Sequence, residues 1–259
     1  MRLTILKDKK ITDDQLDRLR SDFMSMFPIR PTFFEHERDF SYYPTYPDSD
    51  GDLRPTNQFL VDETDFVHSK YGLWGTDHVF IFIHEDNWRS SGKNSLTPRI
   101  KEELLKEHGY IKDKGIWGTN YSNIYHGYQV HYCRYDKDNP ANALGTFYHE
   151  VMHSFDALIK TETGTNIAPL IPVADWDRSV VHGQDSRYEY IRYKENIEVV
   201  DYIKPYLLKS YANRKARFDE QVGLMTNVVQ LLQTLVVLLR QQLNRKNGVN
   251  KCTCLNHDH

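Results

Sequence analysis

Cysteine is scarce in this chain, with only three among its 259 residues. They are Cys133, Cys252 and Cys254, and two of them stand within the last eight residues, which excludes a disulfide framework. Without such cross-links the fold must depend on a hydrophobic core. A chain of this length can bury a sizeable core, in one large domain or two small ones.

An excess of charge of one sign is also lacking. The 33 Lys and Arg residues nearly balance the 36 Asp and Glu residues, giving a net charge of −3 at pH 7. Domains that bind nucleic acid usually carry a strongly basic patch, so the sequence predicts no nucleic-acid partner. Aromatic residues, in contrast, are abundant, with 17 Tyr and 12 Phe, and they can line substrate clefts and interfaces.

Long uninterrupted apolar runs are missing as well. The apolar run within residues 1–7 is too short for a cleaved signal peptide. Residues 222–239 come nearest to a membrane span, but Asn227, Gln230 and Gln233 interrupt them. The sequence therefore predicts no transmembrane segment. It predicts a cytoplasmic protein, or one that is exported or virion-associated without a cleaved signal peptide.

The most informative motif present is His149-Glu150-Val151-Met152-His153, the H-E-x-x-H pattern of zinc peptidases. On a helix, positions i and i+4 share one face, so both imidazoles can bind one metal ion. Glu150 can then act as general base on a water molecule that the ion activates. With 12 His in the chain, composition alone predicts roughly 0.03 such motifs.

The residues around this motif predict a helix with one buried face. Asn139-Pro140 is a start signal, and Gly164 lies shortly beyond the expected end. Apolar residues recur at spacings of three and four along one face, namely at Leu144, Phe147, Val151, Phe155 and Leu158. The opposite face carries His149, His153 and Asp156. The alternative is a surface helix that happens to expose two histidines.

Further elements are expected before this helix. The sequence predicts a strand over 2–7, a helix from the capping box of Thr12 and Gln15 to about Phe27, and an irregular loop over 28–58. It also predicts a buried central strand over 79–83, a helix from Thr97-Pro98 to Gly109, and a half-exposed strand over 128–132. The run Asp48-Ser49-Asp50-Gly51-Asp52 is read as a solvated turn, since it lacks the closing glutamate of a calcium loop.

This order of elements resembles the upper lobe of zincin peptidases, in which the last strand before the active helix lies close to the cleft. The resemblance implies an α+β fold with two lobes, a mixed sheet, an active-site helix and a long C-terminal helix. The corresponding domain would cover residues 1–213, with an upper lobe over about 1–164 and a lower lobe over about 165–213. A strand at the sheet edge can pair with an extended peptide.

Residues 149–156 resemble the active helix of the anthrax lethal factor-like peptidases, which include the Pro-Pro endopeptidases. In that group the third zinc ligand is a glutamate on a later helix, and a tyrosine precedes it by seven residues. Tyr188 and Glu195 have this spacing here. The resemblance thus implies Glu195 as ligand and Tyr188 as oxyanion donor. The residues after Glu195, Ile197-Glu198-Val199, depart from the family's Phe-Ala-Glu, which leaves Glu198 as a rival ligand.

The residues themselves leave the third ligand open. Candidates are Glu162, His182, Glu189, Glu195 and Glu198. Tyr190 or Tyr193 can replace Tyr188 in the same tyrosine-rich stretch. Asp156 is better placed to orient an imidazole than to bind the metal itself.

These residues predict a zinc-dependent endopeptidase that holds one Zn²⁺ ion and acts on a peptide or protein substrate. Glu150 would take a proton from water and pass it to the leaving amine, while Tyr188 would stabilise the oxyanion. One alternative is a non-catalytic assembly protein, a virion or secretion component that retains a zincin fold. Another is hydrolysis of a non-peptide amide. Nothing in the sequence specifies the substrate.

The C-terminal part differs in character. Residues 214–246 predict a long helix with a wide apolar face, which would pack against the domain, form homo-oligomers or bind a protein partner through 222–243, or attach to a membrane surface. Residues 247–259 are read as a flexible tail. Its Cys and His residues are of metal-binding types but have no established spacing.

Overall fold

The computed structural model describes residues 1–26, 29–138, 143, 146, 150–151, 153–155, 157–158, 160–161, 164 and 193–252. The chain divides into two compact units, Met1–Lys215 and Ala216–His259. It has a mixed α+β architecture with a mixed sheet and a long C-terminal helix, which confirms the predicted class at this coarser level.

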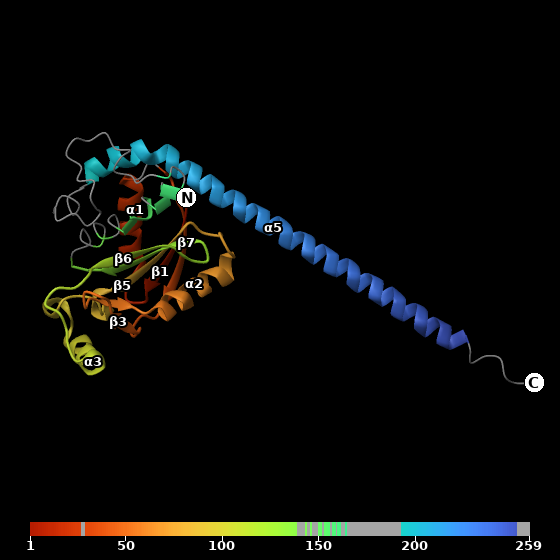
Figure 1. Ribbon diagram of the computed structural model, residues 1–259, viewed down its shortest axis with the longest axis horizontal. Coiled ribbons are helices and arrows are strands. Elements are labelled where there is room, and N and C mark those ends of the chain that lie inside the picture. Colours follow the sequence, from red (N-terminus) through yellow and green to blue (C-terminus); the bar gives the residue numbers. More distant parts are fainter. Residues whose placement is uncertain are drawn as a thin grey trace, which may run out of the picture. The chain divides into compact units, whose positions relative to one another are not determined.

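A five-stranded sheet forms the centre of the first unit (Figure 1). Its strands are β1 (Arg2–Asp8), β2 (Thr32–Arg38), β5 (His78–His84), β6 (Gly118–Tyr125) and β7 (Tyr128–Tyr135). Their order is β2-β1-β5-β7-β6, in which β6 alone runs antiparallel to its neighbour. A separate two-stranded ribbon joins β3 (Thr45–Pro47) and β4 (Leu53–Pro55).

The helices in the described part of the chain are α1 (Asp13–Met26), α2 (Asn57–Tyr71), α3 (Pro98–His108) and α5 (Tyr193–Cys252), with short 3₁₀ turns η1 (Glu85–Asn87) and η2 (Lys93–Ser95). The predicted helix ends are confirmed. At the start of α1 the backbone N–H of Thr12 donates to the side chain of Gln15, and the backbone N–H of Gln15 donates to the hydroxyl of Thr12. Thr97 caps α3, which ends at the left-handed Gly109.

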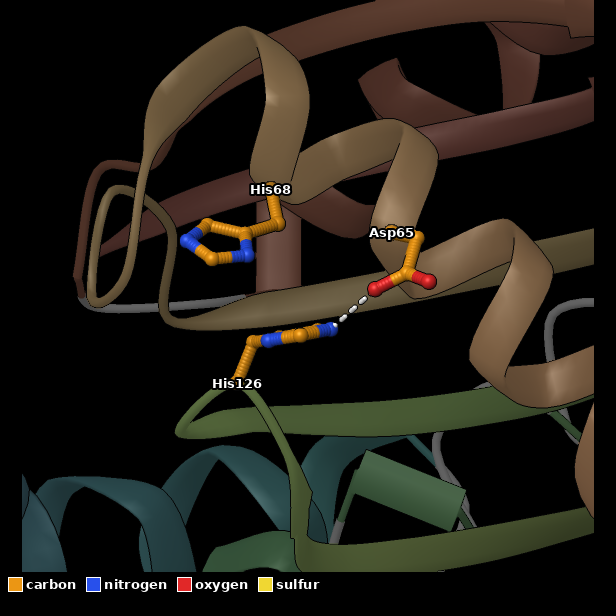
Figure 2. Close-up of side chains that lie close together, drawn as sticks. All are labelled: Asp65, His68 and His126. Atoms are coloured by element: carbon orange, nitrogen blue, oxygen red, sulfur yellow. Dashed lines mark hydrogen bonds and ion pairs between the residues drawn. The ribbon is translucent and has the colours of Figure 1, made fainter.

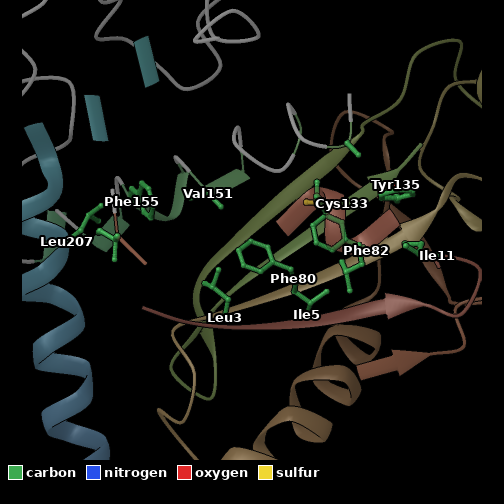
Figure 3. Close-up of a cluster of buried hydrophobic side chains, with 14 of the residues drawn as sticks. Leu3, Ile5, Ile11, Phe80, Phe82, Cys133, Tyr135, Val151, Phe155 and Leu207 are labelled. Carbon is green, nitrogen blue, oxygen red and sulfur yellow. The ribbon is translucent and has the colours of Figure 1, made fainter. Parts of the chain in front are cut away.

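The sheet is covered on both faces, with α1 on one side and α2 on the other (Figure 1). Successive side chains of β5 point alternately into one core and the other. Phe80 and Phe82 face the core that includes α1, whereas Val79, Ile81 and Ile83 face the core that includes α2. Figure 3 shows the first core, in which Val151, Phe155 and Leu207 meet side chains of β1, β5 and β7. The prediction of a buried central strand is confirmed, since every residue of β5 is buried.

The prediction of an irregular loop over 28–58 is wrong. This segment contains β2, β3, β4 and the start of α2. Strand β2 lies at the sheet edge and is only half-buried, so its sequence Thr-Phe-Phe-Glu-His-Glu-Arg lacks the apolar run of a central strand. The predicted turn at Asp48 is present, because Asp48 accepts the backbone N–H groups of Asp50 and Asp52 between β3 and β4.

The prediction that residues 128–132 form a half-exposed strand is also wrong. Every residue of β7 is buried, because β5 and β6 flank it and both sheet faces are covered. Its polar residues Gln129 and His131 point into a buried hydrogen-bond network rather than into solvent. The last strand before the motif is therefore not the edge of the sheet. That position belongs to β6, which the sequence analysis missed.

Helix α5 is 60 residues long and contains Pro205. Leu207 and Tyr211, near its start, belong to the core of the first unit. It continues through Cys252, so the backbone of 247–252 is helical. Along 222–243 the large apolar side chains are 46% to 69% exposed.

Candidate functional site

The H-E-x-x-H segment is helical at each of its described positions, Glu150, Val151 and His153. Val151, Phe155 and Leu158 are buried, which confirms the predicted core-facing side of the helix. His153 is half-buried on the side predicted to hold the metal. On a regular helix, residues four positions apart share one face, as binding to a single ion requires.

Glu150 lies in the interior, with only 4% of its surface exposed. Its carboxylate approaches Gly118, the first residue of edge strand β6. A methyl group on Gly118 would lie 2.8 Å from Oε1 of Glu150 and 2.7 Å from Cγ2 of Thr146. Real Cβ atoms essentially never come that close to other atoms. The absence of a side chain at position 118 is thus what allows the carboxylate to lie against the start of β6.

Burial raises the pKa of the Glu150 carboxyl to about 8, and the positive charge of Arg54 acts in the opposite direction. Arg54 is held by Asp48 Oδ2 at 2.5 Å and by Thr119 Oγ1 at 2.7 Å, so its guanidinium is fixed near the start of β6. A carboxyl with a pKa close to neutrality can both accept and donate a proton at physiological pH. Burial, and then the charge of Glu150, raise the pKa of the nearby Cys133 thiol well above its usual value, which favours the protonated thiol.

A buried hydrogen-bond network fixes the motif helix against the sheet through Ser154, the residue after His153. Ser154 Oγ lies 3.2 Å from Nε2 of His131 and donates to Gln129 Oε1 at 3.3 Å. Asn120 of β6 donates to the same hydroxyl at 2.8 Å and lies 3.2 Å from Nδ1 of His131. One serine thus connects the motif helix with both β6 and β7.

The network continues from His131 to α5. His131 Nε2 lies 3.0 Å from Nδ1 of His78, and His78 Nε2 lies 2.8 Å from the hydroxyl of Tyr211. Burial lowers the pKa of His131 to about 3, and the neighbouring His153 contributes in the same direction. Burial also lowers the pKa of His78 well below its usual value, and His131 adds to this effect. Both rings are therefore neutral at pH 7.

Arg214, three residues after Tyr211 on α5, strengthens the same connection. Its guanidinium binds Asp77 Oδ1 at 3.3 Å and the Asp77 carbonyl at 3.2 Å, and it also reaches the carbonyl of Gly127. Two residues one helical turn apart thus attach α5 to the start of β5 and to the β6–β7 turn. This attachment lies within the first unit.

The structure describes only some of the remaining predicted site residues. Glu195 and Glu198 are helical residues of α5, but the structure describes only their backbone and not their side chains. Other predicted residues lie outside the described residues altogether, namely His149, Asp156, Glu162, His182, Tyr188, Glu189 and Tyr190. The structure thus brings Glu150 and His153 together with the sheet, while the Tyr188–Glu195 half of the site stays a prediction.

Sequence reasoning missed the network residues Asn120, His131, Ser154, His78 and Tyr211. In β7 the alternation of Gln129 and His131 with apolar residues gave the pattern of a solvent-exposed face. The one available signal is the pair Tyr211 and Arg214, which stand three apart on a helix and therefore share a face. That signal does not identify their partners, which lie more than 130 positions away in the sequence.

Comparison with models of known protein families, with curated proteins and with solved structures finds no match to this chain. The function must therefore be inferred from the chain's own residues.

Proposed function

We propose that the chain is a zinc-dependent endopeptidase of zincin type, with Glu150 as its general base. The observation that carries this proposal is the position of the Glu150 carboxylate. It is buried on the H-E-x-x-H helix and lies against the first residue of the sheet's antiparallel edge strand. A structural metal site has no use for an acid–base group held beside it in this way.

In this proposal His149, His153 and Glu195 hold the ion, with Glu198 and His182 as rival third ligands. Bound zinc would supply Lewis acidity, polarising water and the substrate carbonyl. Glu150 takes the proton of the attacking water and delivers it to the leaving amine. Tyr188 donates a hydrogen bond to the developing oxyanion. The network through Ser154 and His131 holds the helix in place, so that the base and the ligands keep a fixed geometry.

The free edge of β6 supports a peptide as substrate. Within the described residues no strand pairs with its outer side, so an extended peptide can add to the sheet there. The strand begins at Gly118, beside the Glu150 carboxylate, and Gly118 adds no side chain that would shield the carboxylate from a passing main chain. A peptide that pairs with this end of β6 would therefore bring its carbonyl groups towards the base.

The proposal is tested by removing and restoring the metal. The full-length protein, treated with a chelator and dialysed, is expected to lose at least 100-fold of its activity against a mixed peptide library, because the water is no longer activated. Zinc at a few equivalents should restore the activity. Hydrolysis that survives complete removal of zinc, as measured by elemental analysis, would exclude this mechanism.

A second observation points to assembly. Two adjacent heptad stripes on α5 are exposed, namely Leu224, Val228, Leu231, Leu235 and Leu238, and Met225, Val229, Leu232, Val236, Leu239 and Leu243. Monomeric proteins rarely expose so continuous an apolar surface. Helix Lys204–Arg245 is also long and apolar enough to cross a membrane, by length and composition alone. We infer that a second copy of the chain covers these stripes, since a polar stripe of Asn227, Gln230 and Thr234 runs along the other side.

The double substitution Leu231→Glu and Leu235→Glu is expected to convert an oligomer into a monomer, because it places charges in the buried seam. Light scattering after size exclusion measures the change in mass. The matched control, Gln230→Glu with Thr234→Glu, adds the same charge to the polar stripe and should leave the oligomer intact. A monomeric wild-type chain would exclude self-association, and flotation of that chain with lipid vesicles would assign the helix to a membrane instead.

A further inference from the structure

We propose a second metal site, formed by Asp65 and His68 of α2 and by His126 in the β6–β7 turn, that binds a divalent cation of the Zn²⁺ type. Figure 2 shows the three side chains converging from two separate elements. Their potential ligand atoms all lie within 4.8 Å of one another. None of the three belongs to the H-E-x-x-H segment, so this site is independent of the proposed peptidase function.

The backbone brings these side chains together by two simple devices. Asp65 and His68 stand three residues apart on α2 and therefore share one face. His126 and Gly127 form the two-residue connection between β6 and β7, with φ of +50° and +73°. Such a turn needs left-handed residues, and Asn, Asp or Gly usually occupy its first position. A histidine there bears a backbone cost of order 1 kcal/mol, which a bond from its side chain can offset.

Contacts within the cluster already orient the rings. Nε2 of His126 lies 2.6 Å from Oδ1 of Asp65. The rings of His68 and His126 face each other with centroids 4.3 Å apart and an angle of 36° between them. Both histidines are half-buried, while Asp65 is exposed and paired with His126. The turn itself is fixed from the other side, because Arg214 binds the carbonyl of Gly127.

Two imidazoles and one carboxylate form a donor set that suits zinc and similar transition ions better than calcium or magnesium, which prefer oxygen alone. Bond lengths of about 2.0–2.2 Å around a tetrahedral ion place the ligand atoms about 3.3–3.6 Å apart. The three ligand atoms lie within 4.8 Å of one another, so metal binding requires shifts of about 1–2 Å in their side chains. Binding requires a neutral imidazole, so the ion displaces any proton that His126 Nε2 donates to Asp65. One open coordination position remains for water.

The expected consequence is a clamp between α2 and the tip of the β6–β7 hairpin. Hairpin register depends on its turn, and β6 carries Gly118 at its other end. An ion at the turn would therefore fix the pairing of Tyr125 with Tyr128, at the hairpin end of β6 that lies beyond its irregularity between Tyr121 and Tyr125.

The test is the zinc content of full-length variants after dialysis, measured by elemental analysis with far-UV circular dichroism as a check of folding. His126→Asn keeps a residue that tolerates the left-handed backbone, and it should reduce the content by one ion per chain. His68→Gln should do the same. The matched control His36→Asn replaces a half-buried histidine that contacts Tyr71, and it should leave the content unchanged.

Two further variants separate this site from other metal ligands. His153→Asn removes an ion only if the proposed active site binds one, and Cys252→Ser with Cys254→Ser removes any ion held by the C-terminal residues. The inference is overturned if His126→Asn and His68→Gln, both folded, keep the wild-type zinc content. If they lose one ion while His153→Asn loses none, the second site stands and the proposed active site fails.

Discussion

Replacing Glu150 with Gln is expected to lower the rate of peptide hydrolysis by about 10²–10⁴-fold, the usual contribution of a general base. The amide has the shape of the carboxyl but cannot accept the proton of the attacking water. The zinc content should stay the same, because Glu150 is not a metal ligand in the proposed site. The two measurements are the rate on a cleaved peptide and elemental analysis of the same sample.

Glu63→Gln is the matched control, since Glu63 is similarly buried, at 6%, and pairs with Arg38 on α2 and β2. It should change the stability but not the activity of the folded enzyme. If Glu150→Gln keeps more than a tenth of the wild-type rate, Glu150 is not the base. If it loses its zinc as well, the carboxylate supports the metal and its role in proton transfer is unproven.

Glu150→Gln should also change how the stability of the metal-free protein depends on pH. The folded-state pKa of Glu150 is raised from 4.5 to about 8, so the folded protein holds this proton more tightly than the unfolded chain. That contribution to the free energy of unfolding is complete below pH 4.5 and is lost as the pH rises through 8. The stability of Glu150→Gln relative to the wild type should therefore rise by about 5 kcal/mol between pH 4 and pH 9.

Acid is expected to unfold the protein through the buried histidines His78 and His131. Their folded-state pKa values lie below the ordinary 6.5, that of His131 at about 3. Between pH 6.5 and these values the unfolded chain binds more protons than the folded one, so stability falls as the pH falls. Each group contributes about 1.4 kcal/mol per pH unit. Over two pH units His131 alone contributes about 3 kcal/mol, a large part of the stability of a small domain, while the raised pKa of Glu150 acts in the opposite sense over the same range.

The measurement is the urea midpoint of the metal-free protein between pH 7.5 and 4.5. His131→Gln removes one titrating ring and should lower the slope of stability against pH by about 1.4 kcal/mol per pH unit. Ser154→Ala, the control, deletes a hydroxyl of the same network that does not titrate, so it should lower stability at every pH without changing the slope. An unchanged slope in His131→Gln would mean that this ring does not resist protonation in the folded state.

The sequence was most informative where local chemistry decides the structure. The hydrogen bonds of Thr12 and Thr97 and the left-handed Gly109 end their helices without help from distant residues. The apolar run of β5 could only belong to a strand covered on both faces. For the same reason the spacing of Val151, Phe155 and Leu158 predicted the buried side of the motif helix correctly.

Prediction failed where distant parts of the chain decide the environment of a residue. Strand β2 is half-polar because it lies at an edge, and the polar residues of β7 are buried because Ser154 and Asn120 satisfy them. A pattern of alternating polarity cannot distinguish solvent from such partners. Of the proposed site, Glu150 and His153 follow from a local motif, whereas the proposed third ligand belongs to a remote segment that no local pattern can place.

The attachment of α5 to β5 sets an order of events during synthesis. The Tyr211 hydroxyl reaches His78 across 133 positions, and Arg214 reaches Asp77 across 137. The ribosome completes β7, the last strand among the described residues, at Tyr135. It needs roughly 76 further residues to reach Tyr211, about 4–15 s at about 5–20 residues per second. During that interval the five described strands of the sheet are complete, but the helix that closes one end of its core is still missing. Completion of the core is thus a late event that depends on α5.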